Sequence, residues 1–203
     1  MNFDDLAAFT LHDVKNRLAV LAGRAEQGGD VQTVRTLHET AATLTRLLAY
    51  YRAANGSLDI SVDAHSPGDL LEDLAADIGQ QTPLAVRTDA QATPALWFYD
   101  EGLVRMVLVS ALHNAMRHAR QGVLLKAQAG GGWLAIEVRD DGPGYPQAML
   151  DDPGSVRPLS ADGTGLGLHL AGRVAALHRH GGRQGRIELQ NDGGALFRLL
   201  LPG

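Results

Sequence analysis

The sequence predicts an α+β protein in which an N-terminal helical hairpin is followed by a layered α/β domain. Apolar residues recur at three- and four-residue steps over residues 1–54, which is the spacing of helices that bury one face. From residue 57 onward, runs with strand character alternate with helical spacing and glycine-rich turns. We therefore divide the chain into residues 1–56 and 57–203.

The composition disfavours several classes of function. The chain of 203 residues has a net charge of −5, which does not favour a nucleic-acid-binding surface. It has no cysteine, so disulfides and thiolate chemistry are excluded. The acidic N-terminus does not resemble a signal peptide, and no apolar run approaches the roughly 20 residues of a membrane span. We expect a cytoplasmic protein with no membrane span and no nucleic-acid partner.

Two apolar seams define the predicted hairpin. Gly28-Gly29-Asp30 separates them and is expected to end one helix and cap the next. Each helix buries only one face, so we expect a homodimer in which two hairpins form a four-helix bundle. Packing of the hairpin onto the rest of its own chain is the alternative. The seam residues are Leu11, Val14, Leu18, Leu21 and Ala25, then Val34, Leu37, Ala41, Leu44, Leu48 and Tyr51.

The first part of the α/β domain is expected to contain three strands and one helix. Residues 58–62 alternate like a strand. Ser66 and Pro67 are typical of a helix N-cap and first helical position. Short strands are expected near residues 84–86 and 95–98.

The second part begins with a helix capped by Asp100 and continues into a mainly β region. A later helix, after residue 165, is expected to end at Gly181-Gly182. A closing hairpin is expected to turn at residues 191–194. The remaining strands are expected at 123–129, 133–138, 186–190 and 195–200.

Two glycine clusters suggest a nucleotide site. Asp140-Asp141-Gly142-Pro143-Gly144 follows an apolar strand, and Gly163-Thr164-Gly165-Leu166-Gly167-Leu168 begins a helix. Glycines allow a backbone to approach a ligand, a helix N-terminus suits phosphates, and a carboxylate accepts a hydrogen bond from an exocyclic amine. Two ordinary turns are the alternative, since 24 of 203 residues are glycine. The order of the clusters favours the site, although neither a dinucleotide fingerprint nor a phosphate loop is present.

The two clusters resemble the G1 and G2 boxes of the ATP-binding fold shared by sensor histidine kinases, gyrase, Hsp90 and MutL. The resemblance implies an α/β sandwich of this type, with ATP and Mg²⁺ as cofactors and Asp140 as the partner of adenine. The loop over residues 145–162 would be a mobile lid over the nucleotide. The other implied cofactor-binding residues of the two boxes are Gly142, Gly144, Gly163, Thr164, Gly165, Leu166, Gly167 and Leu168.

The segment from Ser110 to Ala119 resembles the N box of the same fold. Its asparagine is Asn114, whose side-chain oxygen is implied as the Mg²⁺ ligand. Arg117 and His118 are implied to reach the phosphates. The family often has a second asparagine where this chain has Ser110.

The segment from Leu11 to Leu18 resembles the phosphoacceptor box of dimeric histidine kinases. The resemblance implies that His12 takes the γ-phosphoryl group, that Asp13 acts as base, and that Asn16 positions water for dephosphorylation. His12 and Asn16 are four residues apart, so a helix places them on one face. Arg17 stands where many relatives carry proline, so no obligatory kink is expected there.

Together these resemblances identify the chain as a small histidine kinase. A receiver-domain aspartate on a separate response regulator is expected to take the phosphoryl group, because the chain shows no receiver pattern. A separate sensor or regulatory partner is a further expectation. A phosphotransfer adaptor and an anti-sigma-type serine kinase are alternatives, but the first would need no glycine boxes and the second would lack the His12 box. A MutL-like conformational machine is a further alternative, which the length of the chain disfavours.

Overall fold

The computed structural model describes residues 3–80, 82–152 and 166–203, and within them the side chains of residues 3–12, 15, 35, 38–39, 46, 50, 54 and 166 lie outside the description. The chain folds into two compact units, Met1–Leu58 and Asp59–Gly203. This boundary falls two residues beyond the one expected from the sequence. None of the described helices is both long and apolar enough to cross a membrane.

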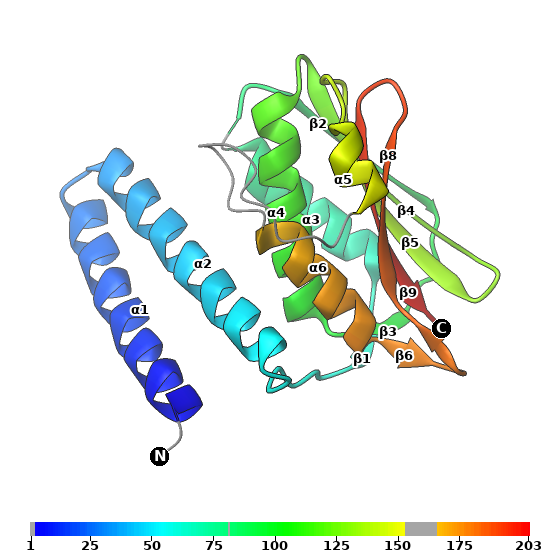
Figure 1. The fold of residues 1–203 in the computed structure, drawn as a ribbon. Coiled ribbons are helices and arrows are strands. Elements are labelled where there is room, and N and C mark those ends of the chain that lie inside the picture. The colour runs from blue at the N-terminus through cyan, green and yellow to red at the C-terminus, as the bar shows by residue number, and fades with distance from the viewer. Residues whose placement is uncertain (1–2, 81, 153–165) are drawn as a thin grey trace. The chain divides into compact units, whose positions relative to one another are not determined.

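The first unit is a helical hairpin (Figure 1). Helix α1 spans Phe3–Gln27 and helix α2 spans Val31–Ala54. Gly29 has φ +71° in the turn between them. Asp30 caps α2, accepting the Thr33 backbone N–H at 3.0 Å and the Thr33 hydroxyl at 2.6 Å. These hydrogen bonds lower the pKa of Asp30.

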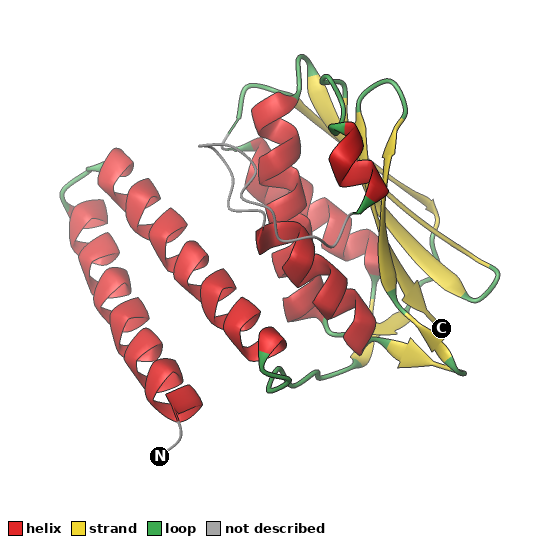
Figure 2. Ribbon diagram, in the orientation of Figure 1, coloured by secondary structure: helices red, strands yellow, loops and turns green. Residues whose placement is uncertain are grey.

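The second unit is an α/β sandwich, as predicted. Its main sheet has five strands in the order β2-β4-β5-β9-β8, of which only the β2–β4 pair is parallel. The long helices lie on one face of this sheet (Figures 1 and 2). The helices of this unit are α3 (Pro67–Gly79), α4 (Glu101–His118), α5 (Gln147–Asp151) and α6 (Leu166–Leu177). The main-sheet strands are β2 (Ala85–Ala92), β4 (Gly122–Gly130), β5 (Trp133–Asp140), β8 (Arg186–Asn191) and β9 (Ala195–Pro202).

Alternation along the strands builds the core between the sheet and the helices. In β4, Val123, Leu125 and Ala127 are buried while their neighbours are half-buried. β5 and β9 are buried on nearly every residue because they occupy the middle of the sheet. Large side chains buried in this core include Leu71, Leu74, Leu108, Leu112, Leu125, Leu134, Ile136, Phe197, Leu199 and Leu201.

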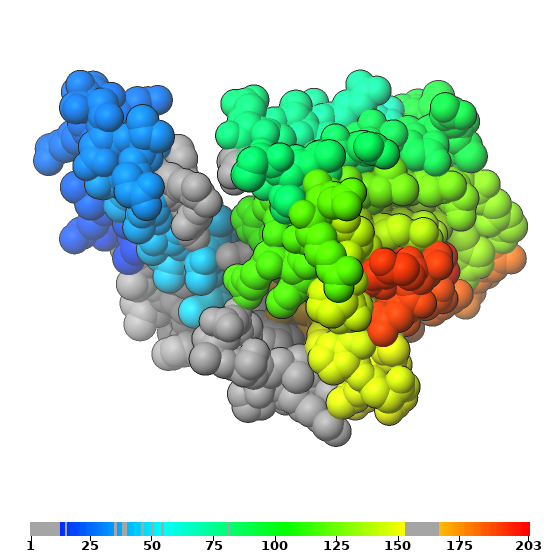
Figure 3. Space-filling view, turned by 90° about the horizontal axis from the view of Figure 1, so that it is seen from above, coloured from blue at the N-terminus to red at the C-terminus, as the bar shows by residue number. Residues whose placement is uncertain are grey.

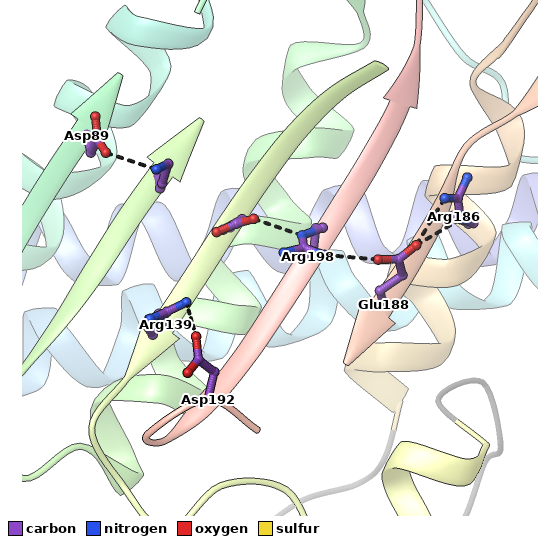
Figure 4. Close-up of polar contacts among 8 residues, drawn as sticks. Asp89, Arg139, Arg186, Glu188, Asp192 and Arg198 are labelled. Atoms are coloured by element: carbon purple, nitrogen blue, oxygen red, sulfur yellow. Dashed lines mark hydrogen bonds and ion pairs between the residues drawn. The ribbon is translucent and has the colours of Figure 1, made fainter. Parts of the chain in front are cut away.

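The other face of the sheet carries a row of alternating charges (Figure 4). Lys126 pairs with Asp89 at 3.3 Å, and Arg198 pairs with Glu137 at 2.8 Å and with Glu188 at 3.2 Å. These five residues are register partners across all five strands. Each strand thus contributes one charge, and the signs alternate along the row, so every charge lies beside at least one of opposite sign.

Two secondary-structure predictions were wrong. Residues 58–62 belong to no strand, and the first strand is β1, Asp63–His65, which pairs with β3, Trp97–Tyr99. The Ser61 backbone N–H instead donates to the side chain of Asp100 at 2.9 Å, which removes it from a strand ladder.

The second error concerns Gly181 and Gly182. Helix α6 ends earlier, at Leu177, and the two glycines form the turn between β6 (Arg179–His180) and β7 (Arg183–Gln184). Their φ values of +54° and +78° suit a tight hairpin turn. Glycine pairs serve helix ends and hairpin turns equally, so the local pattern did not separate the two.

Candidate functional site

Asp140 lies at the end of the central strand β5, where the sheet meets the glycine-rich loop. The residue is only 5% exposed. Its Oδ1 accepts the backbone N–H of Gly142 at 2.8 Å and that of Ala195 at 3.2 Å. Both of these hydrogen bonds reach Oδ1, so Oδ2 has no hydrogen-bond partner among the residues that the structure describes. A buried carboxylate held in this way is suited to accept a hydrogen bond from an amine.

The neighbouring Asp141 has a different task. Its carboxylate accepts the backbone N–H groups of Arg120, at 2.7 Å, and Gln121, at 3.0 and 3.1 Å. These hydrogen bonds lower the pKa of Asp141. The side chain therefore fastens the segment that follows α4 to the glycine-rich loop, a role that the sequence reasoning missed.

The loop after Asp140 approaches two other segments closely enough to require glycine. A Cβ atom on Gly142 would collide with the backbone carbonyl of His118 at the end of α4. Gly144 has φ +86°, and a Cβ atom there would lie 2.7 Å from the side chain of Asn191. Figure 3 shows the loop beside the turn that joins β8 to β9. The loop is thus held between the end of α4 and this turn.

Helix α4 carries the predicted N-box residues toward the same loop. Asn114 is half-buried, whereas Arg117 and His118 are exposed in the last turn. Because the Gly142 backbone packs against the His118 carbonyl, this last turn borders the glycine-rich loop.

The predicted G2 residues are described only in part. Gly163, Thr164 and Gly165 lie outside the described residues, as do residues 153–162 of the predicted lid and the side chain of Leu166. Gly167 and Leu168 are half-buried in the first turn of α6. A Cβ atom on Gly167 would lie 2.8 Å from the Ser110 hydroxyl, so the glycine allows close packing of α6 against α4.

The predicted phosphoacceptor residues lie on α1, in the other unit. The helix is continuous through residues 12–17, which places His12 and Asn16 one turn apart. Asp13 pairs with Arg17 at 2.8 Å on the exposed surface. Asn16 is exposed and borders a shallow groove. Besides Asn16, this groove is lined by Arg17, Val20 and Leu21.

His178 is a buried residue that the sequence reasoning did not single out. Its Nδ1–H donates to the Val174 carbonyl at 2.9 Å, and its Nε2 accepts the Asp100 backbone N–H at 3.0 Å. Burial lowers the pKa of His178. The neutral ring thereby joins the end of α6 to the start of α4, the two helices that carry the predicted G2 and N boxes.

The side chains present bear on how this site could hold a metal ion. Within the described residues there is no group of three or more His, Cys, Asp or Glu side chains arranged to hold a metal ion. Mg²⁺ is commonly bound through one or two protein oxygens together with substrate phosphates and water. A half-buried amide such as Asn114, one helical turn before the residue that packs against the glycine-rich loop, fits that mode of binding.

Residues 99–203 match the family of histidine kinase-, DNA gyrase B- and HSP90-like ATPases. The chain belongs to this family. The match begins at β3 and includes α4, the loop after Asp140, and α6. It therefore contains both glycine clusters and Asn114.

Similar proteins are sensor histidine kinases, which confirms the resemblance seen in the sequence. The signal transduction histidine-protein kinase AfsQ2 of Streptomyces coelicolor is 35% identical over 48% of this chain and 19% of its own. The sensory histidine kinase/phosphatase NtrB of Rhodobacter capsulatus is 26% identical over 97% of this chain and 61% of its own. The chain spans less than two thirds of these relatives.

A solved structure shares the fold. Full-length ShkA, in complex with AMPPNP, superposes with a TM-score of 0.73 at 20% identity, covering 98% of this chain and 45% of ShkA. At this identity the likeness concerns the fold alone.

Proposed function

We propose that this chain is an ATP-dependent protein-histidine kinase of a two-component system. The observation that carries the proposal is the buried Asp140, whose Oδ2 has no partner among the described residues, at the start of a loop that needs glycine at positions 142 and 144. Family membership and the histidine kinases among its relatives support it. Residues 57–203 would bind ATP, and residues 1–56 would dimerise and carry the phosphoryl group.

Each residue of the ATPase unit has a proposed role in holding the nucleotide. Asp140 accepts a hydrogen bond from the adenine amine through Oδ2. Gly142 and Gly144 carry no side chain, so the ligand can approach the loop backbone closely. Asn114 provides an oxygen ligand for Mg²⁺, and Arg117 and His118 contact the phosphates.

The G2 residues complete this proposed site. Thr164 and the glycines around it are proposed to approach the phosphates with their backbone N–H groups, at the start of α6. The residues with this role are Gly163, Thr164, Gly165, Leu166, Gly167 and Leu168.

The hairpin supplies the nucleophile in this proposal. An imidazole nitrogen of His12 bonds to the γ-phosphorus of ATP while the bond to the bridging oxygen breaks and ADP leaves. Asp13 orients the ring and takes its proton. Bound Mg²⁺ would neutralise charge on the phosphates. The phosphoryl group then passes to an aspartate of a response regulator, and Asn16 holds the water that later hydrolyses that acyl phosphate.

Incubation with γ-labelled ATP tests the activity. The label should appear on wild-type protein and be lost in acid, because phosphohistidine is acid-labile whereas phosphoserine is stable. His12→Ala should remain unlabelled. Acid-stable label on both proteins would instead indicate a serine kinase.

Calorimetry with Asp140→Asn tests the adenine contact. Loss of the acceptor at a buried site costs about 1–3 kcal/mol, so ATP affinity should fall about ten- to a hundredfold. Asp89→Asn is the matched control, because Asp89 pairs with Lys126 on the opposite face of the sheet. Equal affinity in the two variants would refute the adenine assignment.

Asn114→Ala tests the proposed metal ligand. The variant should keep much of its nucleotide affinity and lose Mg²⁺-dependent labelling of His12, because the metal orients the γ-phosphate. Unchanged turnover would place the metal elsewhere, and Ser110→Ala would then be tested.

A further inference from the structure

The turn that joins β8 to β9, residues 191–195, contacts both ends of the glycine-rich loop. At the first end, the Ala195 N–H donates to Asp140 Oδ1 at 3.2 Å. Gly194 also packs against the Asp140 backbone so closely that a Cβ atom would collide with its carbonyl. The turn therefore supports the Asp140 carboxylate, which is proposed to accept a hydrogen bond from adenine.

Asn191 holds the second end of the loop. Its Oδ1 accepts the Tyr145 backbone N–H at 2.7 Å, and its Nδ2 donates to the Tyr145 carbonyl at 3.0 Å. A single amide thus satisfies both backbone groups of one loop residue, as a strand neighbour would. Its atoms also occupy the space beside Gly144, where a Cβ atom would lie 2.7 Å away.

The residue held in this way is half-buried at the second end of the loop, five positions after Asp140. Burial, and then the negative charge of Asp140, raise the pKa of the Tyr145 hydroxyl. The position of Tyr145 follows from Gly144, whose φ of +86° turns the chain, and from Asn191, which holds the Tyr145 backbone after that turn.

We propose that Asn191 is a positioning residue for nucleotide binding: its side-chain amide sets the Gly144–Tyr145 backbone and thereby holds the loop that follows Asp140 at the base end of the site. This inference rests on the proposed nucleotide site. It assigns to Asn191 no contact with the nucleotide, and it makes this one side chain of the β8–β9 turn a support of the site.

The chemistry requires an amide at this position. Asparagine supplies one donor and one acceptor. Aspartate would supply acceptors only, so it would face the Tyr145 carbonyl without a proton and add a second negative charge near Asp140. The turn has a separate link to β5, since Arg139 and Asp192 pair at 2.7 Å. Figure 4 shows this ion pair at the same turn.

The first experiment compares Asn191→Ala and Asn191→Asp with Asp192→Asn. Asp192 is the matched control, because it is exposed on the same turn and its side chain pairs with Arg139. Calorimetry would give the affinity of each full-length protein for a non-hydrolysable ATP analogue, for ADP and for adenosine. Thermal unfolding of the nucleotide-free proteins would report stability.

Asn191→Ala should weaken binding of all three ligands by about tenfold, which is the size expected for losing two neutral hydrogen bonds. The loss should be the same with and without phosphates, because the residue acts at the base end. Asn191→Asp should not restore affinity. Asp192→Asn should lower the unfolding temperature without changing affinity, which separates positioning from stability.

A second pair of variants compares a glycine that packs against Asn191 with a glycine that does not. Gly144 and Gly193 both have positive φ, at +86° and +70°, but only Gly144 has Asn191 beside it. Gly144→Ala should therefore weaken binding as Asn191→Ala does, and Gly193→Ala should cost stability alone.

Two results would overturn the proposal, and they are distinguishable. If wild-type protein binds the analogue and both Asn191 variants bind it equally well, positioning by Asn191 is wrong while the nucleotide site stands. If wild-type protein binds none of the three ligands, the proposed function fails and this inference fails with it.

Discussion

The helical hairpin and the ATPase unit differ in how completely each covers its own apolar surface. In the ATPase unit, leucines from α3, α4 and the sheet are fully buried, and Leu108 is 0% exposed. Among the hairpin side chains that the structure describes, the buried ones are Ala22, Ala49 and Ala53. The larger apolar side chains that the structure describes in this hairpin are half-buried or exposed, with Leu21 at 47% and Leu47 at 49%.

This contrast bears on how each region is stabilised. A sheet covered by helices buries one face of each element, so the ATPase unit carries its own core. Two helices alone leave much of each seam uncovered, and a partner surface must supply the rest. The contrast therefore supports the proposal that two hairpins form a four-helix bundle.

The largest expected effect is a core truncation in the ATPase unit. Leu108→Ala removes a fully buried side chain and should lower the free energy of unfolding by about 2–5 kcal/mol. Urea unfolding followed by circular dichroism measures this, and the loss should not depend on protein concentration. Leu96→Ala, at a residue 59% exposed, is the control and should be nearly neutral. Equal losses would contradict a self-contained core.

A charge in the hairpin seam should act through association instead. Leu44 is half-buried, and Leu44→Asp would place an unpaired carboxylate in the proposed bundle. We expect dimerisation to weaken by at least about a hundredfold, which corresponds to about 2.7 kcal/mol. Light scattering should then detect monomers. Thr40→Asp adds the same charge at an exposed position of α2 and should remain dimeric; a stable Leu44→Asp dimer would refute the seam.

A smaller effect should appear in the pH dependence of stability, and it should be confined to the ATPase unit. The pKa of His178 is lowered in the folded ATPase unit, from the value of 6.5 that the unfolded chain has. As pH falls, the unfolded state therefore binds a proton at His178 before the folded state does. The stabilisation that the neutral His178 ring contributes is fully present above pH 6.5 and is lost as pH falls toward the pKa of the folded state. His178→Gln keeps an acceptor for the Asp100 N–H without titrating.

Unfolding of the ATPase unit between pH 7 and 5 measures this effect, with the wild-type curve expected to fall more steeply than that of His178→Gln. Parallel curves for the two proteins would show that His178 does not contribute to the acid sensitivity.

The smallest expected structural effect is at Asn16, on the exposed surface of α1. Asn16→Ala should leave stability nearly unchanged. It should keep autophosphorylation and phosphotransfer, yet prolong the lifetime of the phosphorylated regulator, because an amide can hold a water but is no base at neutral pH. Phosphate loss from a purified regulator, identified by pull-down, would be followed with ADP present. Equal decay with wild-type and variant protein would remove the phosphatase role.

Local patterns determined much of this protein. Asp30, Ser66 and Asp100 cap helices through side chains that bond an N–H three residues along, so each cap is visible in a short stretch of sequence. The strands of the central sheet follow from apolar runs bounded by turns. The order of the two glycine clusters and the asparagine-bearing helix was sufficient to predict the family.

The tertiary structure decided what depends on partners far along the chain. Asp140 and Asp141 are neighbours with the same chemistry, yet one is buried beside Ala195 and the other binds the N–H groups of Arg120 and Gln121. Asn191 was part of a predicted turn, and its hydrogen bonds reach a loop 46 residues away. Sequence spacing specifies which face of an element a residue occupies, but only the packed fold brings the distant groups to that face.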